Sequence, residues 1–278
     1  MNKSIILHIL GWILTVEAVL MIFPCIVAAV YKESSGFAFL IVIVICLLIG
    51  LPLILKKPKS KLFFSKEGII SVALGWIILS IMGALPFYIS SEIPSYTDAL
   101  FETISGFTTT GSSILTDVEI LSKCMLFWRC FTNWIGGMGI LVFILAIMPM
   151  TGGEGMHILR AESPGPSISK LTPRLKTTAL ILYIIYSGMT ALEFILLLIG
   201  RMPIFDALTI ALSTSGTGGF AVKNSSIADY SIYNQVIVGI FMFLFGVNFN
   251  IYYLLLFRRF KAALKSEELK AYFIIVAM

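Results

Sequence analysis

Charge is scarce in this sequence of 278 residues. Asp, Glu, Lys and Arg make up 13% of it, against ~25% in a typical soluble protein, whereas 58% of the residues are hydrophobic. A water-soluble globule needs more charge on its surface, and a disordered chain needs a much lower hydrophobicity. The composition therefore excludes both classes and indicates an integral protein of the lipid bilayer.

Side chains that carry catalysis or bind metals are also few. The chain has two histidines, His8 and His157, and its four cysteines show no Cys-x-x-Cys spacing. No His-Glu-x-x-His motif, paired-carboxylate arrangement or nucleophile motif is present, so a membrane-embedded enzyme has no candidate base. We therefore expect neither enzyme activity nor a cofactor, and we interpret the cysteines as small packing residues.

The basic residues fit membrane topology better than nucleic-acid binding. The formal net charge is +5, but Lys and Arg gather in short clusters between apolar runs, as they do beside membrane spans. With the N-terminus in the cytoplasm, fifteen of the 20 basic residues lie inside. The other five lie outside: Lys32, Lys123, Arg129, Arg201 and Lys223. This excess predicts a multi-pass protein of the cell inner membrane, with a cytoplasmic N-terminus and no nucleic-acid partner.

Six apolar runs are long enough to cross the hydrocarbon core, which takes ~20 residues in a helix. They lie near 5–30, 37–55, 68–90, 126–149, 178–200 and 234–257. The first lacks the small-residue cleavage site of a signal peptide, so we expect it to remain as a span. The chain ends in another apolar run, at 271–278, which we expect to be an interrupted helix of a longer protein.

Two shorter apolar segments, at 96–107 and 205–212, cannot cross the membrane and are typical of re-entrant helices. Each leads into a stretch rich in Thr, Ser and Gly, at 105–113 and at 213–220. The positions of the flanking spans put both segments and both stretches on the outer side.

The region around each re-entrant segment repeats after 108 residues. The shift aligns Thr109 with Thr217 and Gly111 with Gly219, and it superimposes the flanking spans. The sequence thus predicts an all-α polytopic membrane protein with parallel repeats of helix, re-entrant pore helix with filter loop, and helix. We expect four parts: an N-terminal transmembrane helix pair at 1–66, a first repeat at 67–165, a second at 166–262 and a truncated third at 263–278.

The stretches SGFTTTGSS at 105–113 and STSGTGGF at 213–220 have the chemistry of a cation path. Glycine permits a positive φ, which can turn successive carbonyl groups toward one axis. Carbonyl and hydroxyl oxygens can replace the hydration shell of a monovalent cation, and the preceding helix points its partly negative C-terminal end at the same place. Either stretch alone fits an ordinary turn, but two at equivalent places in parallel repeats favour a lining for cations.

Several segments resemble one family. DALFETISGFTTTGSSIL at 98–115 resembles the first pore loop of the Trk/Ktr/HKT superfamily of potassium transporters. The helix FWRCFTNWIGGMGI at 127–140, the stretches LRAESPGP at 159–166 and KLTPR at 170–174, and the loop at 213–228 are similar to the TrkH branch. The N-terminal helix pair fits the same branch.

This resemblance implies a chain of four repeats around one pore, usually in a homodimer, with a cytoplasmic nucleotide-binding regulatory subunit of the TrkA type. The transported ion would be potassium. The positions that match the selectivity filter are Thr109, Thr110, Gly111, Thr217, Gly218 and Gly219. Glycine at the last position of each triplet resembles the potassium-selective type, whereas serine in the first loop goes with sodium transport. The sequence leaves open a sodium-selective or cation-coupled transporter of the same architecture, and a non-conducting truncated half.

Other polar residues carry expectations of their own. Glu17 lies in the first span, where we expect a hydrogen bond between helices. Glu193 lies near the outer end of its span, where we expect a structural role, although its side chain can reach the surface. Asn133 on an inner helix either joins helices or faces the pore, and Gly136 and Gly137 indicate close helix packing. Eight acidic residues predict a mildly electronegative outer mouth: Glu33, Glu92, Asp98, Glu102, Asp117, Glu119, Asp206 and Asp229.

Overall fold

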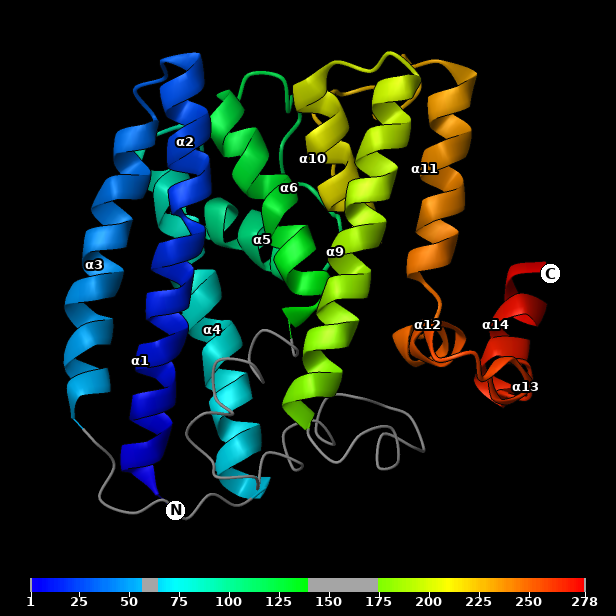
Figure 1. The fold of residues 1–278 in the computed structure, drawn as a ribbon. Helices are drawn as coiled ribbons and strands as arrows, with labels where there is room; N and C mark the ends of the chain where they lie inside the picture. Colours follow the sequence, from blue (N-terminus) through cyan, green and yellow to red (C-terminus); the bar gives the residue numbers. More distant parts are fainter. Residues whose placement is uncertain (1, 57–64, 140–174, 278) are drawn as a thin grey trace.

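The computed structural model describes residues 2–56, 65–139 and 175–277, and the regular structure in these ranges is helical (Figure 1). The helices are α1 (Lys3–Leu20), α2 (Ile22–Tyr31), α3 (Gly36–Leu55), α4 (Ser65–Ile89), α5 (Tyr96–Phe107), α6 (Lys123–Gly137), α9 (Leu175–Ile199), α10 (Ile204–Ser215), α11 (Ile232–Phe245), α12 (Phe249–Leu256), α13 (Phe260–Leu264) and α14 (Glu267–Ala277). An all-helical membrane fold, as predicted, is confirmed.

Four helical segments in the described residues are long and apolar enough to cross a membrane. They are Lys3–Tyr31, Gly36–Leu55, Lys66–Ile89 and Ala179–Ile199, which confirms four of the predicted spans. The first combines α1 and α2, because Met21 between them keeps helical dihedrals. Outward-facing side chains on these spans are apolar, and both Val30 and Leu48 are 70% exposed. Such a surface suits lipid and would be costly in water.

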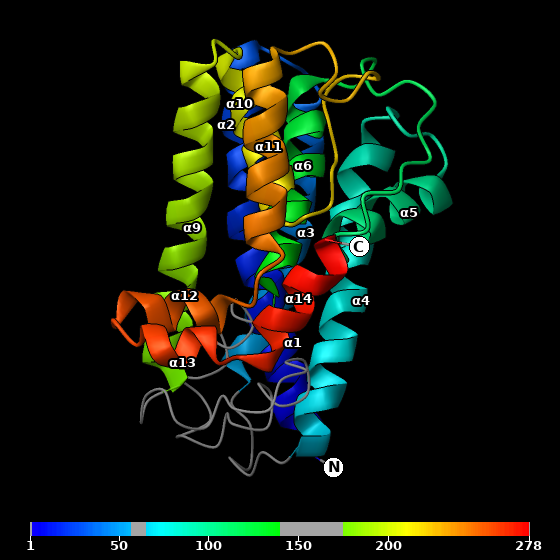
Figure 2. The ribbon, with the colours of Figure 1, turned by 90° about the vertical axis from the view of Figure 1, so that its right-hand side faces the viewer.

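The two predicted inner helices have different outcomes. Of the predicted span at 126–149, the structure describes α6 and the two residues after it, and the rest lies outside the described residues. The predicted span at 234–257 is wrong as a single helix, because α11 and α12 are bent by 89° (Figure 2). The side chain of Asn248 accepts a 2.9 Å hydrogen bond from the backbone N–H of Asn250 and so starts a new helix. Hydropathy stays high across 234–257, so it does not reveal this cap.

Contacts between helix ends define two ends of the bundle. At the lower end in Figure 1, the backbone N–H of Asn2 donates to Oε1 of Glu67 at 3.0 Å, so α1 and α4 begin side by side. At the upper end, Nδ2 of Asn234 donates to the carbonyl of Gly200 at 3.1 Å, joining the start of α11 to the end of α9. The spans therefore alternate in direction as predicted, and α10 descends from the upper end.

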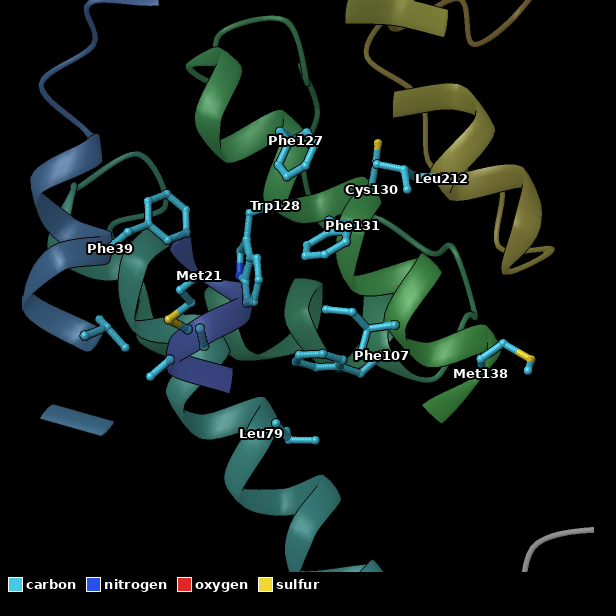
Figure 3. Close-up of a cluster of buried hydrophobic side chains, with 14 of the residues drawn as sticks. Met21, Phe39, Leu79, Phe107, Phe127, Trp128, Cys130, Phe131, Met138 and Leu212 are labelled. Atoms are coloured by element: carbon cyan, nitrogen blue, oxygen red, sulfur yellow. The ribbon is translucent and has the colours of Figure 1, made fainter. Parts of the chain in front are cut away.

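The core lies where the N-terminal helices meet α4, α5 and α6 (Figure 3). Trp128 on α6 is fully buried at its centre, and its indole Nε1–H donates to the carbonyl of Gly83 at 2.9 Å. The rings of Phe39, Phe107 and Phe131 surround it at centroid distances of 5.9, 6.2 and 6.2 Å. This packing fixes the end of α5, from which the first Thr/Gly stretch leaves.

The cysteines behave as the composition predicts. Cys46, Cys124 and Cys130 are buried and Cys25 is half-buried, all as free thiols.

Candidate cation-conduction site

Both re-entrant helices form where the sequence predicts them. The hydroxyl of Ser95 caps α5 by accepting from the N–H of Asp98, and Asp206 lies in the first turn of α10. An acidic residue in the first turn is favourable because the N-terminal end of a helix is partly positive. The opposite, partly negative ends of α5 and α10 lead into residues 108–113 (loop 1) and 216–220 (loop 2).

The two loops repeat the same backbone conformation. Thr109 and Gly111 have φ values of 55° and 72°, and Thr217 and Gly219 have 53° and 81°. These are equivalent positions after the shift of 108 residues. A left-handed conformation is rare for threonine and costs ~1–3 kcal/mol. Its recurrence at the same place in both loops identifies a defined structure rather than two unrelated turns.

Backbone N–H groups of both loops are used by the helix ends before them. In loop 1, Thr110 donates to the carbonyl of Ser105 at 2.9 Å, and in loop 2 the equivalent Gly218 donates to Ser213 at 3.4 Å. The N–H groups of Thr109 and Thr217 bond back in the same equivalent way, at 3.0 and 2.8 Å. These four backbone donors are thereby occupied.

The structure brings the two loops together. A Cβ atom added at Gly111 would overlap the carbonyl group of Gly218, so the two backbones touch. Thr110 and Thr217 are exposed beside this contact. Exposed polar backbone within a membrane protein is tolerated only where it lines water or meets other protein. All six predicted filter positions thus lie at one place with an open polar side.

Helix α6 packs between the loops, and this close approach accounts for the glycines in the helix. A Cβ atom at Gly136 would overlap the carbonyl of Phe107, and one at Gly137 would lie 2.9 Å from the Cα of Gly216. Close packing at these glycines, as predicted, is confirmed. Nearby, Nδ2 of the buried Asn133 donates to the hydroxyl of Ser213 at 3.1 Å, so this asparagine joins helices.

Sequence reasoning missed a buried ion pair behind the loops. Nε of Arg129 on α6 pairs with Oε1 of Glu102 on α5, and both side chains are almost completely buried. We predicted both as charges of the outer side. The signal that could have revealed them is an arginine within an apolar helix, because a charge at membrane depth needs a partner.

Several of the carboxylates predicted at the outer mouth accept hydrogen bonds from other groups of the protein. Glu33 accepts a 2.7 Å hydrogen bond from the backbone N–H of Lys123 at the start of α6. Asp206 accepts a 2.9 Å hydrogen bond from the hydroxyl of Tyr230, whose pKa is raised by burial. Because Glu102 and Asp206 are buried, the predicted acidic mouth is wrong for these two residues.

The two carboxylates predicted within spans are also buried. Glu17 on α1 is 1% exposed, and neither of its oxygens has a hydrogen-bond partner among the described residues, so the predicted hydrogen bond between helices is wrong there. Glu193 on α9 is completely buried, so its side chain does not reach the surface.

Comparison with known proteins gives relatives across nearly the whole chain. The family model TrkH, described as cation transport protein, matches residues 35–274. The Trk system potassium uptake protein TrkG of Escherichia coli (strain K12) is 34% identical over 100% of this chain and 59% of its own length. The Trk system potassium uptake protein TrkH of Salmonella typhimurium is 38% identical over 92% of this chain and 54% of its own length.

A solved structure has the same fold. The crystal structure of the potassium transporter TrkH from Vibrio parahaemolyticus matches with a TM-score of 0.76 and 31% sequence identity, covering 91% of this chain and 52% of that one. The chain therefore spans little more than half the length of these relatives. The family model covers most of the chain, and the helices agree with the solved fold. The chain belongs to the TrkH family of cation transport proteins.

Proposed function

We propose that the full-length protein containing this chain takes up potassium across the inner membrane, and that the six loop positions form part of its selectivity filter. They are Thr109, Thr110, Gly111, Thr217, Gly218 and Gly219. The observation that carries this proposal is the pair of left-handed positions that recurs in two touching loops. Relatives named as potassium uptake proteins support potassium as the ion.

The geometry suits a dehydrated monovalent cation. Carbonyl oxygens replace part of its water shell, and they do so without a fixed charge that would hold the ion too tightly. The C-terminal ends of α5 and α10 add partly negative potential. A membrane potential of 100 mV contributes ~2.3 kcal/mol per unit charge to inward movement. Transport, rather than catalysis, is thus the function proposed.

The proposed assembly follows from the repeats. We infer that parts 67–165 and 166–262 are two of four repeats around one pore, that 1–66 is an added helix pair, and that 263–278 begins a third repeat. The lower end in Figure 1 then faces the cytoplasm, in agreement with Lys3 and Lys66 at the starts of α1 and α4.

The proposed partners are a second copy of the protein and a cytoplasmic nucleotide-binding subunit of the TrkA type. We place the latter against the basic inner segments, of which Arg160, Lys170 and Arg174 lie outside the described residues.

Growth at low potassium tests the proposed function. The full-length protein should restore growth to a strain that lacks potassium uptake, and Gly111→Ser or Gly219→Ser should lose potassium preference because both glycines have a positive φ. Gly188→Ser and Gly239→Ser are matched controls, since a Cβ at either position meets no atom of the described residues within 4 Å. Unchanged growth and selectivity in both filter variants would refute the filter, and sodium uptake equal to potassium uptake would favour the sodium alternative.

A further inference from the structure

The buried ion pair behind the loops reaches both of them. Besides pairing with Glu102, Arg129 donates from Nη1 to the carbonyl of Ala221 at 2.8 Å. Its guanidinium carbon lies 3.7 Å from the ring centroid of Phe220, within the range of a cation–π contact. Ala221 and Phe220 directly follow the filter positions of loop 2, so one face of Arg129 holds the outgoing end of that loop.

Glu102 makes the corresponding contacts with loop 1. Its carboxylate accepts hydrogen bonds from the hydroxyl of Ser113, at 3.0 and 3.2 Å, and from the backbone N–H of Ile114, at 3.0 Å. These residues lie two and three positions after Gly111, the last filter position of loop 1. The pair of Arg129 and Glu102 is therefore a continuous connection between the outgoing ends of the two loops.

Stability alone does not account for such a pair. Removing two charges from water is expensive, and replacing a buried ion pair with apolar residues of similar volume is often neutral or stabilising. The pair instead fixes the directions of its contacts, because the planar guanidinium has several donors in fixed directions and stacks on an aromatic ring. A lysine at the same place has one compact ammonium group and cannot make all three contacts at once.

We propose that Arg129 is a positioning residue that fixes the spacing of loop 1 and loop 2 and so determines the preference for potassium over sodium. This inference rests on the proposed function. Oxygens held apart by a rigid connection suit the larger ion, whereas released loops can close on the smaller one. The pair carries no net charge, so it positions the loops without repelling a passing cation.

Selectivity in the full-length protein tests the inference. Uptake of potassium and of sodium is measured for the wild type, Arg129→Lys, Phe220→Leu and Arg201→Lys. The matched control is Arg201, an exposed arginine in the turn between α9 and α10. We expect the potassium-to-sodium ratio to fall about tenfold in Arg129→Lys, or ~1.4 kcal/mol of discrimination. Phe220→Leu should lower it less, and Arg201→Lys should leave it unchanged.

The ratio separates positioning from folding, because a loss of folded protein lowers both rates equally. A wild-type ratio in Arg129→Lys and in Phe220→Leu would overturn the inference. If Arg129→Lys yields no transport, Phe220→Leu decides, and an unchanged ratio there overturns the inference as well. Absence of potassium uptake in the wild type would instead refute the proposed function.

Discussion

Gly111 and Gly219 show how equivalent residues can have different reasons for being glycine. Both have a positive φ, which any side chain would strain. At Gly111 a Cβ would also overlap Gly218, whereas at Gly219 the nearest atom to a Cβ is Cε of Met242 at 3.6 Å. Position 111 is therefore required by backbone contact as well as by conformation, and position 219 by conformation alone.

Glu17 is a residue whose replacement should stabilise the protein. Within the part of the chain that the structure describes, its carboxyl group is buried without a hydrogen-bond partner, which costs ~1–3 kcal/mol. Glu17→Met keeps a similar volume and removes the polar atoms, so we expect a higher midpoint of thermal unfolding in detergent. Glu33→Gln is the contrast, since Glu33 accepts from the N–H of Lys123 and its replacement should lower the midpoint. A lower midpoint for Glu17→Met would contradict the prediction.

For single residues, the sequence predicts the filter positions but not the ion pair that connects the two loops. Thr109 and Gly111 stand out because their pattern recurs at Thr217 and Gly219, and recurrence is visible without coordinates. Arg129 and Glu102 are 27 residues apart, on elements whose packing no local pattern specifies. Long-range pairing of single charges depends on how the helices cross, and that information is spread over the whole core.

Among the connecting segments, Asn224 joins the loop after α10 to the loop after α5. Its Oδ1 accepts from the N–H of Val118 at 2.8 Å, and its Nδ2 donates to Oδ1 of Asp117 at 2.7 Å. The hydrogen bond from Asn224 lowers the pKa of Asp117 from its ordinary value of 3.8. A carboxylate with a lowered pKa stabilises the folded state above its ordinary pKa, and this is lost as pH falls through the lowered value.

We therefore expect Asp117→Asn to reduce stability at neutral pH and to make no difference at a pH below the lowered pKa. Thermal unfolding of the wild type and the variant across that range measures the difference. Asp98→Asn is the control, because Asp98 makes no such bond to Asn224. A difference that grows on acidification would contradict the assignment.

Helix positions are the part of the fold that the sequence predicts best. Runs of apolar residues near 20 in length mark α3, α4 and α9 directly, because a span must match the bilayer. The length of the apolar run does not predict the break between α11 and α12. It depends on one side-chain cap at Asn248 and on the hydroxyl of Tyr272, which donates to the carbonyl of Phe243 at 2.8 Å.

For the molecule as a whole, the orientation in the membrane can be tested by labelling. In a background without the native cysteines, Ser226→Cys at the upper end should react with a membrane-impermeant thiol reagent in intact cells. Lys56→Cys at the lower end should react only after permeabilisation. Both side chains are exposed: Ser226 lies within the loop between α10 and α11, and Lys56 caps the end of α3. The reverse pattern would refute a cytoplasmic N-terminus.

The occupied N–H groups of the two loops have a consequence for which ions the molecule rejects. The donors of Thr109, Thr110, Thr217 and Gly218 bond back to the helix ends before them. A halide approaching these four amide groups would therefore find their hydrogens already bonded. Because backbone amides do not titrate, acid in the surrounding medium should leave this part of the exclusion of negative ions intact.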